Sequence, residues 1–147
     1  DFFINYGLQA INRKEYIHDF EILNPKNKKF EFRAYKVSKR RYEDISTITG
    51  AFYCDDTLNN KPKVRFAFGG MAGGPKRSKS LENLFIKKSG TDIDDKNVKM
   101  AVKSDFQPLT DCRATSQYRQ RVAENLFKKF CYFVNNKFDI EEIKRVS

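Results

Sequence analysis

The sequence predicts an α+β domain in which an antiparallel sheet of three to four strands is covered on one face by a layer of about three helices. Apolar residues alternate with a period of two in the first part of the chain and recur every three to four residues from Arg77 onward. Between these parts, the glycine-rich stretch GGMAGGP at 69–75 ends the strand pattern. A chain of 147 residues, of which 39% are hydrophobic, is sufficient to bury one core.

Four segments have the alternation and composition of strands. They are residues 16–23, 30–38, 45–54 and 63–68. Polar segments that favour turns or loops separate them, at 24–29, 39–44 and 55–62. We therefore expect a leading strand, a break near Pro25, and then three strands of the main sheet.

The second of these strands contains an unusually placed lysine. Phe30, Phe32 and Ala34 fall on one face of the strand, and Lys36 falls on the same face. We expect this apolar face to be directed toward the core. A charged ammonium group directed there is costly unless it is paired or reaches the surface, so Lys36 is the first indication of a ligand site.

Three helices are expected after the glycine-rich stretch. Their apolar residues cluster at 81–85, 98–102 and 118–133, the last with spacing near i, i+4. Thr115 or Ser116 could cap the long helix. The last residues, DIEEIKRVS at 139–147, are interpreted as a short extra helix or a frayed tail.

The glycine-rich stretch allows two interpretations. Its backbone N–H groups could surround a phosphate, with help from Lys76 or Arg77. The segment lacks both GxxxxGK[ST] and a GxGxxG that follows a strand and opens a helix. We therefore favour a structural turn.

The formal charge of +10 permits an anionic partner: nucleic acid, an acidic membrane face or an anionic cofactor. The best nucleic-acid candidate is KRRY at 39–42, but the chain has no RNP1 pattern and no helix-turn-helix spacing. A small basic nucleic-acid-binding domain is kept as the alternative function. No apolar run approaches the ~20 residues of a membrane span, so we expect no membrane partner.

The sequence predicts neither a metal site nor a catalytic residue in this chain. Cys54, Cys112 and Cys131 stand far apart without a CxxC pair, so we interpret them as small buried thiols. His18 has no nucleophile that we can associate with it. The odd number of cysteines and the lack of a secretory h-region predict a cytoplasmic protein.

Four segments, taken in order, resemble the FAD subunits of xanthine dehydrogenases and their carbon monoxide dehydrogenase relatives. They are DFFINYG at 1–7, EFRAYKVSKRRYEDIS at 31–46, FAFGGMAGGPKR at 66–77 and SDFQPLTDCRATSQYRQRVAENLFKKF at 104–130. The bacterial split-subunit form is the more similar one. The resemblance implies that residues 1–24 end a preceding PCMH-type FAD-binding domain and that 25–147 form a CO dehydrogenase flavoprotein C-terminal domain. The first residue, Asp1, also suggests a piece of a longer chain.

The resemblance also implies roles for individual residues. Lys36 is expected to contact the flavin, and the 39–44 loop resembles a mobile segment near the isoalloxazine ring. Arg40, Glu43 and Asp44 are the candidate residues in this loop, and which carboxylate faces the flavin is left open.

The block at 104–130 is given a structural role. Cys112 stands where a methionine is common in the family, and we interpret it as a core substitution. Arg113, Tyr118 and Arg119 are expected to anchor the long helix on the sheet through buried hydrogen bonds.

The implied reaction is purine (xanthine or hypoxanthine) oxidation at a molybdopterin centre in another subunit. Electrons pass through two [2Fe-2S] clusters to FAD and then to NAD. The expected partners are the upstream PCMH-type domain, the iron–sulfur domain and the molybdenum-binding subunit. The present chain would help to bind and cover the flavin. By itself it is predicted to be inactive.

Overall fold

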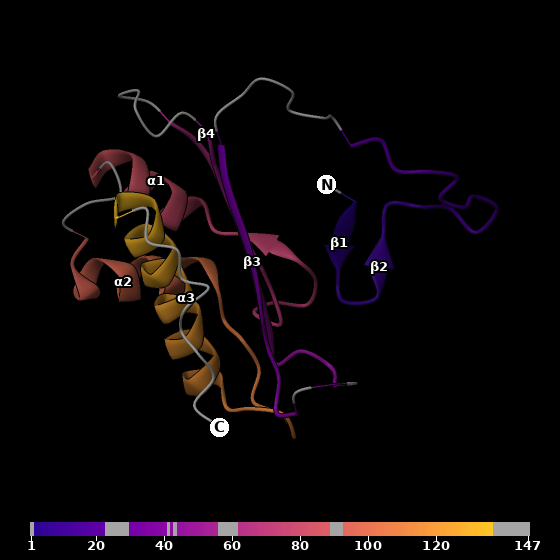
Figure 1. The fold of residues 1–147 in the computed structure, drawn as a ribbon. Coiled ribbons are helices and arrows are strands. Elements are labelled where there is room, and N and C mark those ends of the chain that lie inside the picture. The colour runs from indigo at the N-terminus through magenta and orange to yellow at the C-terminus, as the bar shows by residue number, and fades with distance from the viewer. Residues whose placement is uncertain are drawn as a thin grey trace.

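The computed structural model describes residues 2–22, 30–40, 42, 44–55, 62–88 and 93–136. Figure 1 shows a four-stranded sheet seen nearly edge-on, with the helices on one side and the N-terminal segment on the other. The predicted α+β class, with an antiparallel sheet and a one-sided helical layer, is confirmed.

The main sheet has the strand order β3-β4-β5-β6, with every neighbouring pair antiparallel. Its strands are β3 (Phe30–Val37), β4 (Ile48–Asp55), β5 (Lys63–Gly69) and β6 (Lys76–Arg77). The three strands expected in the main domain are confirmed, although β4 begins three residues later than predicted. The two-residue strand β6 was not predicted, because so short an element has no alternation to detect.

All three helices of the predicted layer are present: α1 (Lys79–Lys88), α2 (Asp95–Asp105) and α3 (Ser116–Asn136). Asp94 caps α2 by accepting a hydrogen bond from the backbone N–H of Lys96 at 3.2 Å. Thr115 caps α3, because its Oγ1 accepts from the backbone N–H of Tyr118 at 3.2 Å. In the part of the chain that the structure describes, no helix is both long and apolar enough to cross a membrane.

Phenylalanine packing joins the sheet to the helices. Phe52, Phe66 and Phe68 point from β4 and β5 toward the helical layer, and each is essentially inaccessible to solvent. The ring centroids of Phe52 and Phe130 lie 5.3 Å apart, and those of Phe66 and Phe127 lie 5.5 Å apart. Each buried ring contributes about 1.5–3 kcal/mol of transfer free energy, so this cluster is the main source of stability in the domain.

Lys36 lies on the face of β3 that points away from the helices. The prediction that this face is directed toward the core is therefore wrong. Phe30 and Phe32 are 39% and 49% exposed, whereas the alternate residues Tyr35 and Val37 pack against the core. Which residues share a face was predicted correctly.

Long charged side chains pack over aromatic rings on the inward side of β3. Because such residues are usually exposed, the sequence pattern did not identify this side as the one that faces the core. The guanidinium carbon of Arg33 lies 3.8 Å from the centroid of the Phe133 ring, and Lys129 Nζ lies 4.9 Å from that of Tyr35. At an edge strand, such amphipathic side chains can cover the core while their charged ends reach water.

The N-terminal segment contains a small hairpin, β1 (Phe3–Asn5) and β2 (Leu8–Gln9), in place of the expected strand at 16–23. Residues 16–22 have no regular structure, and Tyr16, Phe20 and Ile22 are 79%, 80% and 87% exposed. Alternation alone cannot form a strand, because the backbone also needs a pairing partner. The expected domain boundary at 24/25 lies outside the described residues.

The cysteines differ from one another. Cys54 and Cys131 are buried as expected, and burial raises the pKa of the Cys131 thiol to about 12. Cys112 is exposed, so its interpretation as a core substitution is wrong. Its position in the loop before α3 places it outside the apolar stripe of that helix.

Gly70 follows β5 with φ +78°, and a Cβ built on it would lie 2.4 Å from the backbone oxygen of Thr47. We expect Gly70→Val to lower the free energy of unfolding by at least about 1–3 kcal/mol, because it combines left-handed strain with a backbone clash. Thermal denaturation checks this. Gly7→Val is the matched control, since Gly7 also has positive φ but open space around it. Equal melting temperatures for the wild type and Gly70→Val would contradict the prediction.

Candidate functional site

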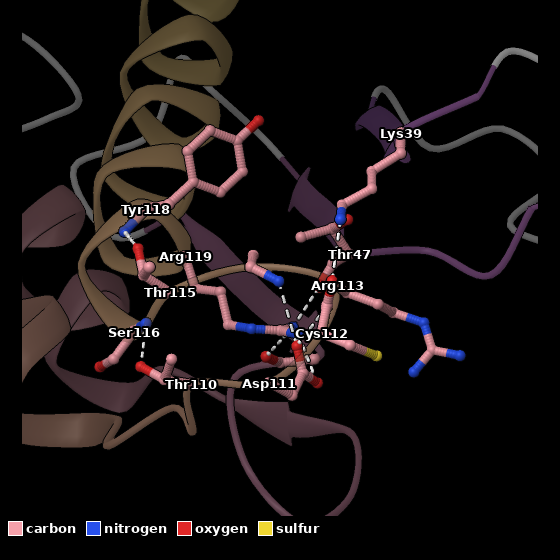
Figure 2. A network of polar contacts seen from close by, with 12 residues as sticks. Lys39, Thr47, Thr110, Asp111, Cys112, Arg113, Thr115, Ser116, Tyr118 and Arg119 are labelled. Carbon is pink, nitrogen blue, oxygen red and sulfur yellow. Dashed lines mark hydrogen bonds and ion pairs between the residues drawn. The ribbon is translucent and has the colours of Figure 1, made fainter.

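Arg119, near the start of α3, joins three segments that lie far apart in the sequence (Figure 2). Its side chain is only 6% exposed. Nη1 donates to the backbone oxygens of Thr47 and, at 2.9 Å, of Gly70, while Nη2 donates to both carboxylate oxygens of Asp111 at 2.8 and 2.9 Å. The guanidinium therefore fixes the approach to β4, the turn after β5 and the loop before α3 relative to one another.

Asp111 completes this network by organising its own loop. It accepts hydrogen bonds from the backbone N–H groups of Ala114 at 3.1 Å and Arg113 at 2.9 Å. The bond from Ala114 and the bonds from Arg119 lower the pKa of Asp111 to about 2, so the carboxylate is ionised at neutral pH. Lys39 Nζ donates to the backbone oxygen of Cys112 at 2.8 Å, which ties the loop after β3 to the same place.

Of the four residues predicted to contact the cofactor, the structure brings Arg40 and Asp44 together. The backbone N–H of Arg40 donates to Asp44 Oδ2 at 3.0 Å, and Arg40 Nε lies 4.0 Å from the same oxygen. The backbone bond from Arg40 is the main reason that the pKa of Asp44 is lowered. The pair closes the loop on itself, and Glu43 lies outside the described residues.

Lys36 lies apart from that pair, on what we call the outward face of the sheet. This face comprises the side chains that point away from the helices: Phe30, Phe32, Ala34, Lys36, Thr49, Ala51, Tyr53, Asp55, Lys63, Arg65 and Ala67. Ala34, Ala51 and Ala67 are paired neighbours across three strands, and Lys36 is in register with Thr49 and Gly69 in the next row. The face therefore has a flat row of alanines that is flanked by aromatic and charged side chains, with Lys36 in the row beside it.

Of the three residues expected to anchor α3, Arg119 alone does so. The guanidinium of Arg113 has no hydrogen-bond or ion-pair partner among the described residues, and Tyr118 is 49% exposed. Helical phase could have identified the correct residue, because Arg119 precedes Ala123, Phe127 and Phe130 by four, eight and eleven positions on the buried stripe.

The glycine-rich stretch serves close packing at two places. Gly70 allows the approach of Thr47 described above. Further along, a Cβ on Gly73 would lie 3.1 Å from atoms of Tyr6, so the stretch also receives the N-terminal hairpin. Lys76 Nζ donates to the backbone oxygen of Asp105 at 2.6 Å, and Arg77 forms a bidentate pair with Glu82. Both cations that a phosphate cradle would use already have protein acceptors, which favours the structural turn.

A sequence model of the CO dehydrogenase flavoprotein C-terminal domain matches residues 33–134, which include the whole Arg119 network and Lys36. The chain belongs to this flavoprotein family. Within the family domain, no group of three or more His, Cys, Asp or Glu residues in the described ranges could hold a metal ion.

Solved structures share the fold of this flavoprotein domain. Carbon monoxide dehydrogenase from Hydrogenophaga pseudoflava matches with TM-score 0.55 and 20% identity over 68% of this chain and 34% of that chain. Quinoline 2-oxidoreductase from Pseudomonas putida 86 matches with TM-score 0.57 and 12% identity over 74% and 38%. Reconstituted CO dehydrogenase from Oligotropha carboxidovorans matches with TM-score 0.56 and 13% identity over 68% and 35%.

The chain thus spans little more than a third of the length of the solved chains that it resembles. No curated protein sequence matches it significantly.

We expect Arg119→Lys to lower the free energy of unfolding of the flavoprotein domain by roughly 2–4 kcal/mol, because one ammonium cannot serve acceptors on three segments. Arg121→Lys, two residues along the same helix and exposed, is the matched control and should change stability little. Chemical denaturation measures both. A loss no larger in Arg119→Lys than in Arg121→Lys would show that the network does not hold these loops.

Proposed function

We propose that this chain is the C-terminal domain of the FAD subunit of a xanthine dehydrogenase-type molybdenum hydroxylase. It helps to bind and cover the flavin, which takes electrons from two [2Fe-2S] clusters and passes them to NAD. The purine is oxidised at the molybdopterin centre of another subunit. Membership of the flavoprotein family supports this proposal, and so does the ordered series of motifs.

The observation that carries the proposal is a large uncovered apolar surface on one side of the sheet. Phe30 and Phe32 are substantially exposed on the outward face, and the N-terminal segment lies on that same side (Figure 1). This segment adds further exposed side chains: Phe3, Ile4, Tyr6, Leu8, Tyr16, Ile17, Phe20 and Ile22. So much apolar surface on one side indicates a partner, which we take to be the upstream PCMH-type domain.

The corrected orientation of β3 makes Lys36 more accessible to a cofactor held by that upstream domain. A lysine directed into the core would need an internal partner, whereas Lys36 borders the flat alanine row of the outward face. The ammonium group could donate a charge-assisted hydrogen bond to the flavin or to its ribityl–phosphate chain. The three alanines leave room for a planar group or a closely packed backbone.

The loop after β3 would contribute charge beside the flavin. Backbone N–H groups, that of Arg40 above all, lower the pKa of Asp44, and the Arg40 side chain next to it is 76% exposed. Together with Lys36, these residues can orient the cofactor, exclude water from one side and adjust the local potential. Glu43 is retained as a candidate on the resemblance alone.

The nucleic-acid alternative is weakened at its best motif. In the KRRY segment, the Lys39 ammonium is committed to the backbone oxygen of Cys112 at 2.8 Å, so it is not poised for a phosphate backbone.

Xanthine-dependent reduction of NAD by the purified complete enzyme is the measurement that tests the proposed activity. We expect turnover with xanthine or hypoxanthine and no turnover with carbon monoxide or quinoline. A complete enzyme that contains flavin and oxidises either of the latter two but no purine would contradict the proposed substrate class and leave the flavoprotein assignment intact.

In the complete flavin subunit, we expect Lys36→Ala to weaken FAD retention by roughly 10- to 150-fold, which corresponds to a charge-assisted hydrogen bond of about 1.5–3 kcal/mol. Equilibrium titration of the apoprotein with FAD measures this. Lys63→Ala is the matched control, because Lys63 lies in register with Phe30 and Asp55 at the opposite end of the sheet. Unchanged FAD affinity in Lys36→Ala would remove the residue from the site.

A further inference from the structure

We propose that the surface around Tyr118 is a binding site for a small nucleotide, with the base against the tyrosine ring and the phosphates among the surrounding cations. This inference goes beyond the flavin proposal, because it uses the helical side of the domain and the loop before α3, and it shares none of the residues assigned to the flavin, although Ser38 and Lys39 come from the loop after β3. None of its residues belongs to the outward face.

Two cavities meet at the start of α3. One, of about 540 Å³, lies between α2 and α3, and the other, of about 380 Å³, lies beside the Arg119 network. Both are lined by Thr115 and Tyr118, so these two residues form the common wall. Each cavity falls in the size range of small-molecule sites, and a nucleotide could place its base on the wall and its phosphates in one cavity.

The charge of these cavities is strongly unbalanced. Lys99, Lys103 and Arg121 line the larger cavity, where Glu124 is the one carboxylate. Lys39 and Arg113 line the smaller cavity, which has no carboxylate in its described wall.

Most of these cations are uncommitted. No acceptor is bound by the side chains of Lys99, Lys103, Arg113 or Arg121 among the described residues, in contrast to Lys128, which pairs with Asp95 at 3.0 Å. A group with two or more negative charges would satisfy several cations at once.

Tyr118 supplies the second element of the site. Figure 2 shows its ring projecting from the first turn of α3 away from the buried network that its neighbour Arg119 enters. Tyr118 is 49% exposed, and Gln117 and Gln120 line the larger cavity beside it. A half-exposed aromatic ring next to amides and cations is suited to stack on a base while the phosphates are bound nearby.

This combination favours a nucleotide over an inorganic anion or an acidic peptide. An inorganic anion would use the cations and leave the ring and amides unoccupied. An acidic peptide would also use the cations, but it has no purine or pyrimidine base to place against the ring and the amides. The shared chemistry of base and phosphate could come from a free nucleotide or from the end of a nucleic-acid strand, and we propose the free nucleotide.

Calorimetric titration of the complete flavin subunit with ADP, pyrophosphate and a single-stranded DNA oligonucleotide tests the site. FAD is kept saturating so that the flavin site is filled. We expect ADP to bind more tightly than pyrophosphate, with affinity that falls as ionic strength rises. Tyr118→Ala should weaken ADP binding by about 10-fold, Tyr118→Phe should retain it, and neither should alter pyrophosphate binding.

Variants that remove charge test the other half of the site. Lys103→Ala combined with Arg121→Ala should weaken ADP and pyrophosphate alike, by at least about 10-fold. Lys87→Ala combined with Lys96→Ala removes the same charge from exposed helical positions outside both cavities and is the matched control.

Three results would overturn the proposal. They are equal losses of ADP affinity in the two double variants, tighter binding of the oligonucleotide than of ADP, and an ADP affinity that Tyr118→Ala leaves unchanged. Because FAD retention is measured separately, failure of this site and failure of the flavin proposal can be told apart.

Discussion

The chain provides helices for one face of its sheet, and this constraint determines most of the structure. Phe52 and Phe66 are buried because α3 presents Phe127 and Phe130 to them, and Phe68 packs on Phe106, which follows α2. The opposite face has no such layer, so its phenylalanines and alanines remain accessible. An antiparallel sheet can leave one face to water, but then that face is normally polar. Here Phe30 and Phe32 are exposed beside a row of alanines, so the domain is stabilised through one face and leaves apolar surface accessible on the other.

Arg119 gives the loops at one end of the sheet a defined arrangement that regular hydrogen bonding could not provide. Loops have no ladder of backbone bonds, so their relative positions depend on individual contacts. A guanidinium has several donors in a rigid plane and can therefore hold Thr47, Gly70 and Asp111 at once. The segment that carries Lys39, Arg40 and Asp44 is fixed at its far end by this same group. A buried residue thus determines the geometry of a surface that it does not reach.

The sequence predicted the parts of this fold in which periodic burial and secondary structure coincide. Phe66 and Phe68 on β5 and an apolar stripe within 118–133 on α3 were predicted, because each of these faces packs against an apolar neighbour. Prediction failed where a tertiary partner decides the outcome. In β3 the charged residue Arg33 lies on the core side, where its guanidinium packs on Phe133. Residues 16–22 have the alternation of a strand but no neighbouring strand to pair with. Strand register and the family resemblance singled out Lys36, Arg40 and Asp44 as candidates, whereas the outward direction of Lys36 and the Arg40–Asp44 contact depend on the tertiary structure.

The order of the strands has a consequence for how the domain behaves when it is separated from its neighbours. β3 ends the sheet, and among the described strands its outer backbone edge has no pairing partner. β3 is eight residues long and carries Phe30 and Phe32. A strand from another molecule could therefore pair with its free edge. Its charged residues Glu31, Arg33 and Lys36 oppose such stacking. Lys36, which adjoins the exposed phenylalanines, can thereby also act as a gatekeeper against aggregation.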